Sequence, residues 1–395
     1  SDVNCAVVIN GHNALLEPGG LSSNISISNC IVKAGGYGIV ASGPQDTMIN
    51  TNNSATNNTI TDYYRGGFWL MNTAGFTAAE NTIHLNYSPA PSYGVLGENI
   101  TNCLISKNDI IADYAGIRLE GTDIDNQDSG NTLDSNSIAG YWAYGVDLEF
   151  QNNITVSNNT ITGKDTSTYS DGIRARDVSD IYFSKNVVTN GYSSIDISGQ
   201  SHDPRTSGGT VDSNTLLESW GYGITIDDHD GLTVSNNTVV VRDTSAFDYG
   251  IYYINSDSAT ISGNTVSQAD ISIRCDGVDA ANPSVGNVLS GNVLSDFTSR
   301  GIGVAYHENL VVSGNQITTP TQVSYGIKVE ESNHITVDSN QVQGGRYGMY
   351  IESLGGASNF NGTVCENVVS DFWLYGIRIR EMDSLTVCNL SLIHI

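Results

Sequence analysis

A short phrase recurs along almost the whole chain and constrains its fold more than any other feature. The phrase alternates apolar and polar residues and then places an Asn before another apolar residue, as in Ile154–Ile161 and Leu232–Val239. The Asn positions span 338 residues over 13 intervals, a mean spacing of 26. They are Asn29, Asn58, Asn81, Asn108, Asn136, Asn159, Asn186, Asn214, Asn237, Asn264, Asn292, Asn315, Asn340 and Asn367. A unit this short cannot bury its own apolar face, so neighbouring units must stack.

A second phrase, Gly followed by Ile or Val, lies between these Asn positions, for example at Gly172-Ile173 and Gly223-Ile224. Both phrases alternate with a period of 2, which is typical of short β-strands. The sequence therefore predicts an all-β, single-domain parallel β-helix, a solenoid of about 15 coils over residues 1–390. We expect the repeated Asn side chains to point inward and to hydrogen-bond from coil to coil as an Asn ladder.

These repeats resemble those of the pectate-lyase-like superfamily of right-handed parallel β-helix proteins, and the resemblance covers nearly the whole chain. It implies right-handed winding, which parallel crossovers also prefer in general. The superfamily includes polysaccharide lyases, hydrolases, uronan epimerases, phage tailspikes and adhesins, so the resemblance implies polysaccharide as the partner.

Signature motifs of these enzymes are absent or altered in the chain. There is no Gly-His-Gly, and Gly376–Arg380 only partly matches the Arg-Ile-Lys signature of polygalacturonase-like enzymes. His202-Asp203-Pro204 contains the residues of the epimerase run Asp-Pro-His in another order, and the calcium-binding Gly-Gly-x-Gly-x-Asp nonapeptide is missing. The resemblance therefore predicts the fold and leaves the reaction open.

The spacing of the Asn residues also cycles in threes, with 78 residues for three coils. Duplication of a three-coil unit explains this super-repeat, and a sugar-sized trough between the inserted loops is the alternative. At the C-terminal side the pattern calls for Asn at position 390 and finds Leu390. We expect residues 391–395 to form a tail outside the repeat, either after truncation or because they are not native.

Charged residues gather at the outward position two residues after the Gly of the second phrase. Four consecutive coils supply Arg118, Asp147, Arg174 and Asp196 there. One interpretation is a ladder of alternating charges, which supports strand register. The other is a saccharide groove, in which Asp147 and Asp196 are the two carboxylates of an inverting hydrolase.

The groove interpretation assigns further roles. Asp227 with Asp228 is a second carboxylate pair, and a lyase or epimerase could use His202 or His229 as its base. Because His229 aligns with His307 under the 78-residue shift, it could equally be a feature of the repeat. Arg174 or Arg176 would then neutralise a uronate carboxylate. The residues expected to bind substrate are Arg118, Glu149, Arg176, Asp203, Arg205, Asp228 and Tyr252.

The charge balance restricts the partners. Lys and Arg number 16 against 42 Asp and Glu, a net charge of -26 that repels nucleic acid and anionic membranes. No run of 18 apolar residues predicts a membrane span. We therefore expect a protein that binds polysaccharide outside the cell or at its surface, with flanking domains or an oligomer left open as further partners.

The cysteines and potential ligands predict no definite cofactor. Of the six cysteines, Cys365 and Cys388 lie about one coil apart and could pair, but buried free thiols are the preferred interpretation. No zinc-ligand spacing occurs, and Ca²⁺ is the one cofactor left open.

The sequence thus predicts a protein active on an acidic polysaccharide, through lyase, epimerase or hydrolase chemistry. The main alternative is a non-catalytic surface adhesin or structural module that binds glycans. A third possibility is binding of ordered water by Thr columns, but only Thr59/Thr61 and Thr160/Thr162 form a full Thr-x-Thr pair.

Overall fold

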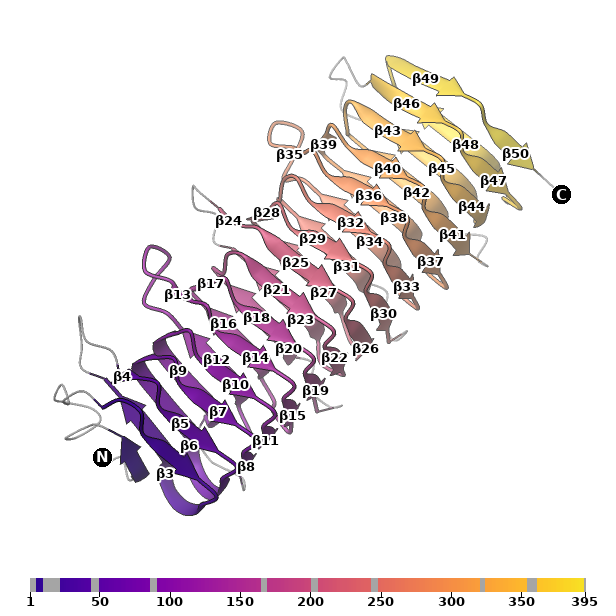
Figure 1. Ribbon diagram of the computed structural model, residues 1–395. Helices are drawn as coiled ribbons and strands as arrows, with labels where there is room; N and C mark the ends of the chain where they lie inside the picture. The colour runs from indigo at the N-terminus through magenta and orange to yellow at the C-terminus, as the bar shows by residue number, and fades with distance from the viewer. Residues whose placement is uncertain are drawn as a thin grey trace. The chain divides into compact units, whose positions relative to one another are not determined.

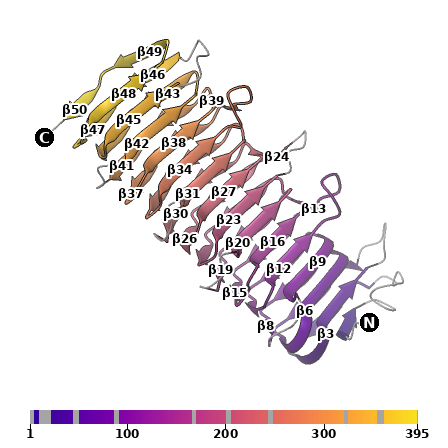
Figure 2. The ribbon, with the colours of Figure 1, turned by 180° about the vertical axis from the view of Figure 1, so that it is seen from behind.

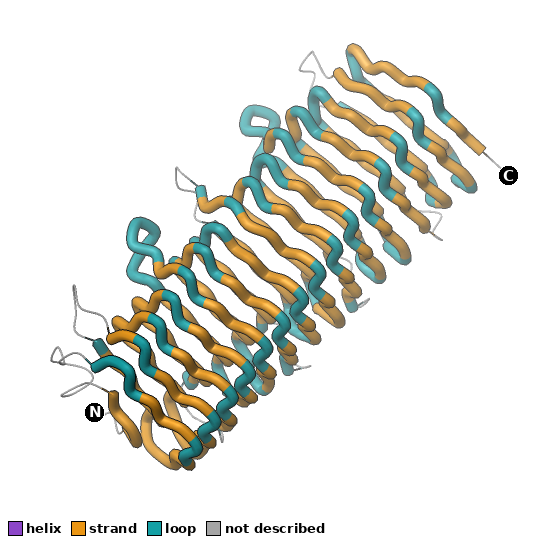
Figure 3. Tube along the Cα trace, viewed as in Figure 1, coloured by secondary structure: helices purple, strands orange, loops and turns teal. Residues whose placement is uncertain are grey.

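The computed structural model describes residues 5–9, 22–43, 50–85, 91–164, 169–199, 205–242, 248–319, 324–353 and 361–393. The chain divides into two compact units, Ser1–Asp196 and Ile197–Ile395. The described residues form strands and loops, and no helix is found among them (Figure 3). This part of the chain offers no helix with the length and apolarity needed to cross a membrane.

Both units are built from the same coil, which confirms the predicted parallel β-helix. Each coil carries three strands, called here first, second and third strands in chain order, and each strand pairs in parallel with its counterpart in the next coil. Figure 1 shows the strands of each unit side by side in chain order. Each residue pairs with the equivalent residue of the next coil, so apolar residues stack on apolar residues. Leu133 pairs with Val156, for example, and Ile138 with Ile161.

The strand bounds follow the two sequence phrases. First strands are β2 (Ser26–Ser28), β5 (Ser54–Thr56), β7 (Thr77–Ala79), β10 (Leu104–Ser106), β14 (Thr132–Asp134), β18 (Thr155–Ser157) and β21 (Ile181–Ser184) in the first unit, and β25 (Gly209–Asp212), β29 (Thr233–Ser235), β32 (Thr260–Ser262), β36 (Val288–Ser290), β40 (Val311–Ser313), β43 (Ile335–Asp338), β46 (Asn361–Cys365) and β49 (Ser384–Cys388) in the second. Second strands are β8 (Thr82–His84), β11 (Asp109–Ile111), β15 (Ser137–Ala139), β19 (Thr160–Thr162) and β22 (Val187–Thr189), then β26 (Thr215–Ser219), β30 (Thr238–Val241), β33 (Thr265–Ser267), β37 (Val293–Ser295), β41 (Gln316–Thr319), β44 (Gln341–Gly344), β47 (Val368–Ser370) and β50 (Ser391–Ile393).

Third strands carry the residues of the predicted groove. They are β1 (Cys5–Ile9), β9 (Tyr93–Thr101), β12 (Ala115–Glu120), β16 (Tyr144–Glu149), β20 (Asp171–Arg176) and β23 (Ser193–Ser198), then β27 (Tyr222–Asp227), β31 (Tyr249–Ile254), β34 (Ile271–Asp276), β38 (Arg300–Ala305), β42 (Tyr325–Glu330), β45 (Tyr347–Glu352) and β48 (Tyr375–Arg380). The long strands β3 (Ile31–Ser42) and β6 (Thr59–Ala74) combine a second and a third strand, and β4 (Asn50–Thr51) pairs with β6. Short pairs close the turns after third strands: β13 (Asp128–Ser129) with β17 (Gln151–Asn152), β24 (Thr206–Ser207) with β28 (His229–Asp230), and β35 (Ser284–Val285) with β39 (His307–Glu308).

Apolar side chains fill the inside of each coil. Val156, Ile161 and Ile173, from the first, second and third strands of one coil, are fully buried. Burying such a side chain is worth about 1.5–3 kcal/mol, and the alternating strands do this once every second residue. The outward residues of the same strands are left for the surface and for the site.

The predicted Asn ladder is present. Asn159 donates from Nδ2 to the carbonyl of Leu133 at 2.9 Å and to Oδ1 of Asn186 at 3.0 Å. Its own Oδ1 accepts hydrogen bonds from the backbone N and the Nδ2 of Asn136, at 2.9 and 3.0 Å. The prediction that Asn29 belongs to the ladder was wrong. Asn29 adopts the left-handed conformation (φ 56°) one residue earlier, and Cys30 occupies the ladder position, where its backbone N donates to Asn58 Oδ1.

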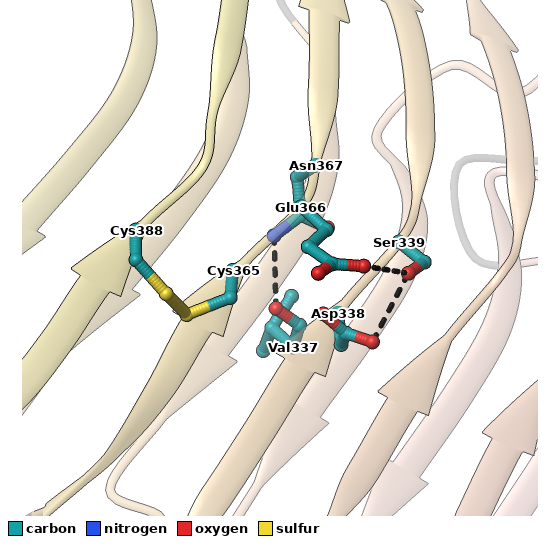
Figure 4. Close-up of a disulfide and its surroundings, with 7 residues drawn as sticks. All are labelled: Val337, Asp338, Ser339, Cys365, Glu366, Asn367 and Cys388. Atoms are coloured by element: carbon teal, nitrogen blue, oxygen red, sulfur yellow. Dashed lines mark hydrogen bonds between the residues drawn. A yellow bond between two sulfur atoms is a disulfide. The ribbon is translucent and has the colours of Figure 1, made fainter.

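Two features near the C-terminal side differ from expectation. Cys365 and Cys388 form a disulfide between adjacent coils, on β46 and β49, with their Cα atoms 4.6 Å apart (Figure 4). The preference for free thiols was therefore wrong for this pair, because parallel register places the two side chains directly next to each other. Ser391–Ile393, expected to fit no coil, forms β50 and pairs in register with β47, since backbone pairing there needs no Asn.

Candidate functional site

The third strands of the first unit position the charged residues, and Figure 2 shows β12, β16 and β20 side by side. On β20, Gly172 is closely packed next to the charged residues. A Cβ at Gly172 would overlap Cγ1 of Val188 and lie 2.6 Å from the carbonyl O of Ser194. The close packing fixes the start of the strand, so Asp171 and Arg174 reach the outer surface at defined places.

Three of the predicted residues form an ion-pair ladder across three coils. Asp147 lies between Arg118 and Arg174, at 3.3 Å from Arg118 Nη1 and 2.8 Å from Arg174 Nη2. The side chain of Asp147 is 0% exposed. The ladder of alternating charges predicted from the sequence is thus observed for these three residues. A carboxylate buried between two guanidinium groups is not within reach of a bound sugar.

A second line of pairs runs beside this ladder. Glu149 accepts a hydrogen bond from Arg176 at 2.8 Å and a longer one from Arg118 at 3.3 Å. Arg118 also donates to Glu120 at 2.9 Å. These contacts unite all the charged residues predicted on β12, β16 and β20 into one network.

Each nitrogen of Arg174 has a partner within the protein. Its Nε and Nη2 bind Asp147, and its Nη1 donates to the Tyr144 hydroxyl at 2.5 Å. The guanidinium also stacks on the Tyr144 ring, with Cζ 3.7 Å from the ring centroid. Arg174 therefore orients Tyr144 and Asp147.

Asp171 is a residue that the sequence reasoning missed. It pairs in register with Tyr144 and is the only charged residue that the described part of the first unit shows in the register column Cys5, Tyr37, Gly66, Tyr93, Ala115, Tyr144, Asp171. Burial and, to a smaller extent, the Asp196 carboxylate together raise the pKa of Asp171 to about 7, against the lowering effect of hydrogen bonds from Ser193. The signal in the sequence was the replacement of an aromatic or small residue by Asp just before Gly172.

Asp171 and Asp196 are thus two electrostatically coupled carboxyl groups on neighbouring third strands, β20 and β23. Close carboxyl groups cannot both ionise at low cost, so one of them holds its proton to a higher pH. An acid with a pKa near neutrality can donate its proton and take it back under physiological conditions. Asp196 thus acts electrostatically on Asp171, whereas the sequence analysis had paired it with Asp147.

The predicted residues of the second unit form a separate cluster. Arg205 binds Asp230 at 3.3 Å and the carbonyl of Asn255 at 2.8 Å, and its Nε lies 3.8 Å from Asp228. Asp228 also accepts a hydrogen bond from Asn255 Nδ2. Burial and the Asp228 carboxylate raise the pKa of Asp227.

His229 points into the coil instead of toward the surface. Its side chain is 0% exposed, with Nδ1 3.1 Å from Thr206 Oγ1 and Nε2 2.9 Å from the carbonyl of Gly208. His307, its counterpart under the 78-residue shift, is buried as well. His202 and Asp203 lie outside the described residues.

Tyr252 is part of an aromatic stack. Its ring lies 4.7 Å from that of Tyr249 at an interplanar angle of 15°, and Tyr222 stacks on both. Partly buried tyrosines with parallel rings present flat apolar faces and hydroxyl groups together.

Metal ligands do not gather in the part of the chain that the structure describes. No group of three or more His, Cys, Asp or Glu side chains there is arranged to hold a metal ion.

Two family models match the chain. The family described as "Right handed beta helix region" matches residues 87–239 and 239–390, and the family described as "Periplasmic copper-binding protein (NosD)" matches residues 1–161. No curated protein matches the sequence.

Several solved structures are similar to the chain at low identity. The periplasmic alginate epimerase AlgG is 15% identical, with 90% of this chain and 76% of that chain covered and a TM-score of 0.40. The Dettilon tailspike protein is also 15% identical, with 88% and 62% covered and a TM-score of 0.47. The A-module of the Azotobacter vinelandii mannuronan C-5 epimerase AlgE6 is 11% identical, with 90% of each chain covered and a TM-score of 0.39.

Proposed function

Because the chain belongs to the right-handed β-helix family, whose model covers residues 87–390, we propose that its third strands bind polysaccharide and that Asp171 and Asp196 cleave a glycosidic bond. The observation that carries the proposal is the partly buried position of Asp171 on β20, in register with Tyr144, where burial and the Asp196 carboxylate raise its pKa to about 7. Glycosidases use two carboxyl groups, one of which stays protonated until it protonates the leaving oxygen.

In this proposal Asp171 is the general acid and Asp196 the second carboxylate. Asp171 protonates the glycosidic oxygen, the bond to the anomeric carbon breaks, and the leaving sugar departs as an alcohol. Asp196 takes the proton of the water that attacks the anomeric carbon, or it forms a covalent bond to that carbon, which water then breaks after giving its proton to Asp171. Tyr144, held by Arg174, supplies a hydroxyl and a ring face beside the acid.

Lyase or epimerase chemistry on a uronate has less support at this site. Both reactions need a cation that neutralises the sugar carboxylate before the proton beside it is removed. Arg174 and Arg176 were the predicted neutralisers, and both already bind protein carboxylates: Arg174 binds Asp147, and Arg176 binds Glu149. Of the two predicted bases, His229 is buried inside the coil, and His202 lies outside the described residues.

The second candidate function is glycan binding without turnover, as in an adhesin or structural module. The observation that favours it is the complete pairing of Asp147 with Arg118 and Arg174, which needs no ligand to satisfy the charges. Under this alternative the raised pKa of Asp171 only reflects the burial of an acid in the register column that contains Tyr144.

We also propose that the protein works outside the cytoplasm. The Cys365–Cys388 disulfide supports this, because such bonds persist in oxidising compartments and are rare in the cytosol. The net charge of -26 is compatible with solubility in an extracellular medium.

The test is a screen of acidic and neutral polysaccharides that follows new reducing ends and the absorbance of unsaturated uronates. Asp171→Asn and Asp196→Asn are compared with Asp109→Asn, which removes the same charge from an exposed carboxyl group paired with His84. We expect reducing ends without unsaturated products, a loss of at least about 100-fold in both site variants, and no loss in the control.

Other outcomes reject parts of the proposal. Unsaturated products would assign a lyase and overturn the hydrolytic mechanism. Binding without turnover by the wild-type protein would assign the non-catalytic function. Equal turnover by all three variants would remove Asp171 and Asp196 from the chemistry.

A further inference from the structure

Trp142 lies on the turn between β15 and β16 of the first unit, and it is 46% exposed. The residue before it, Tyr141, is fully buried inside the coil. The backbone N of Trp142 donates to the carbonyl of Asp113, on the turn of the preceding coil, at 2.8 Å. Tyr141 therefore anchors this turn in the core, while Trp142 is held at the surface.

Tyr114 joins Trp142 to two further tyrosines. Its ring centroid lies 5.0 Å from that of Trp142, 5.6 Å from that of Tyr93 and 5.8 Å from that of Tyr144. The interplanar angles are 76°, 79° and 86°, so all three contacts are edge-to-face, a geometry that aromatic pairs prefer. Trp142 is thus an exposed ring whose orientation is set before a ligand arrives, which lowers the entropy cost of binding.

This aromatic cluster (Tyr93, Tyr114, Trp142 and Tyr144) reaches the proposed acid. Tyr144 pairs in register with Asp171 on the next coil, and Trp142 precedes Tyr144 by two residues. At ~3.3 Å per residue and ~4.8 Å per coil, the backbone of Trp142 is roughly 8 Å from that of Asp171. A saccharide bound at Asp171 that runs toward the preceding coil therefore passes over Trp142.

The charges next to the aromatic cluster are balanced by the protein itself. Lys164 and Asp113, on the turns one coil after and one coil before Trp142, form an ion pair at 3.1 Å. The arginines of β12 and β20 bind carboxylates of β12 and β16, and they are Arg118, Arg174 and Arg176. An anionic sugar unit here would have to displace one of these carboxylates against the net charge of -26. A neutral sugar unit meets no such cost.

We infer that Trp142 stacks on a neutral pyranose unit next to the bond that Asp171 cleaves, and that it selects units whose hydroxyl groups are equatorial. The inference rests on the proposed function and deepens it, because it names the class of sugar at one position of the substrate. A pyranose with equatorial hydroxyls presents C–H groups on its faces, and such a face packs flat on the large apolar surface of an indole. An axial hydroxyl would stand between the sugar and the ring.

Calorimetric titration of the full chain with two pentamers tests the inference. The first is a β-1,4-linked glucose pentamer, whose hydroxyls are all equatorial. The second is the glucuronate pentamer of the same linkage, which differs only at C6, where it carries a carboxylate. Trp142→Leu removes the ring, and Trp142→Tyr keeps a ring face. Trp373→Leu is the matched control, since Trp373 belongs to the second unit and is similarly exposed, at 55%.

We expect the wild-type protein to bind the glucose pentamer at least about 10-fold more tightly than the glucuronate pentamer. Trp142→Leu should weaken binding of the glucose pentamer at least about 10-fold and Trp142→Tyr less than about 3-fold, with no change in Trp373→Leu and the same thermal midpoint in every variant. Tryptophan fluorescence should change when the glucose pentamer binds the wild type or Trp373→Leu, and this change should be absent in Trp142→Leu.

Three outcomes overturn the inference. They are a wild-type protein that does not bind the glucose pentamer, equal or tighter binding of the glucuronate pentamer, and a folded Trp142→Leu variant that binds the glucose pentamer like the wild type.

Comparison with Asp171→Asn separates this inference from the proposed function. If Trp142→Leu weakens binding of the glucose pentamer while Asp171→Asn leaves turnover intact, the sugar platform stands and the catalytic proposal fails. If Asp171→Asn abolishes turnover while Trp142→Leu binds the glucose pentamer like the wild type, the catalytic proposal stands and the platform fails.

Discussion

Asp171 differs chemically from the residues that precede it in its column. Tyr144, its neighbour, places a hydroxyl and a ring where Asp171 places a carboxyl group. Burial and the Asp196 carboxylate hold that group protonated near neutrality. One substitution in an otherwise structural column is enough to create an acid, because the repeat already supplies the partly buried position and the charged neighbour.

The first prediction concerns the pH dependence of turnover. Because Asp171 must be protonated to act as an acid, kcat/KM should fall as pH rises through about 7, the raised pKa of Asp171. Ser193→Ala removes a hydrogen bond that lowers this pKa, so the falling limb should move to higher pH. Ser194→Ala is the matched control, because the Ser194 hydroxyl has no hydrogen-bond partner among the described residues. A rate that is flat across neutral pH would rule out this role.

A second residue-scale prediction concerns stability. Burial raises the pKa of Asp128 to about 7, against hydrogen bonds from Ile100 N and Gln151 Nε2. A carboxyl group whose folded pKa exceeds its unfolded value of about 3.9 contributes its full stability below pH ~4 and loses it as pH rises through about 7. Asp128→Asn should therefore raise the free energy of unfolding at pH ~8, by up to about 4 kcal/mol, and change it little at pH ~4.

Denaturant unfolding at both pH values checks this prediction. Asp134→Asn is the opposite case. Against a small effect of burial, hydrogen bonds from Asn158 and Ser157 lower the pKa of Asp134, so its contribution is present at neutral pH and lost in acid. If Asp128→Asn destabilises the protein equally at both pH values, the buried acid is not protonated in the folded state.

The Asn ladder links successive coils through buried hydrogen bonds. Asn159→Ala leaves the carbonyl of Leu133 and the backbone N of Asn136 without their partners inside the coil. We expect a loss of about 2–5 kcal/mol in the free energy of unfolding, from two or more unsatisfied buried groups. Thr160→Ala, at the exposed neighbouring position, should cost less than about 0.5 kcal/mol. Hydrogen exchange at Asn136 locates the effect, and equal losses in the two variants would mean that the ladder is not the source.

The disulfide joins two adjacent first strands. Closing the 23-residue separation between Cys365 and Cys388 should stabilise this part of the second unit by about 3 kcal/mol. Reductant should therefore lower the thermal midpoint of the wild-type protein and have no effect on the double variant Cys365→Ser/Cys388→Ser. Thiol titration of the denatured protein before and after reduction checks the bond itself, and an unchanged titre would show that it does not form.

Strands and their register were predictable because the signals are local. Alternation every second residue and one Asn per coil specify what faces inward, and parallel stacking then follows with no long-range information. The pairing of Cys365 with Cys388 was not decided by the sequence, since spacing of about one coil permits a disulfide but does not require it. The sequence left His229 open between a base and a feature of the repeat, because a polar segment such as 227–230 does not reveal which side chain turns inward.

The candidate site was predictable in part. Columns of outward residues located Arg118, Asp147 and Arg174 next to one another, and the ion pairs follow from opposite charges on adjacent strands. The role of Asp171 was not accessible, because a pKa depends on how much solvent the neighbouring coils exclude and on which charge lies beside it. Sequence shows the residue types in a column but not the burial of each member.

At the scale of the whole molecule, the net charge of -26 and the acidic substrate predicted from the sequence oppose each other. Long-range repulsion lowers the rate at which a polyanion approaches, whereas local cation clusters decide where it is held. A chain with only 16 basic residues can hold such a substrate only where those residues gather. Most of the acidic surface then serves solubility, and the chemistry is confined to a few coils.

The most direct test of the account is a crystal structure of Asp171→Asn with an oligosaccharide that the wild-type protein cleaves. The account predicts a glycosidic oxygen within hydrogen-bond distance of the residue 171 side chain, with Asp196 facing the anomeric carbon of the same sugar. A sugar bound on the first strands, or bound with residue 171 contacting protein alone, would contradict it.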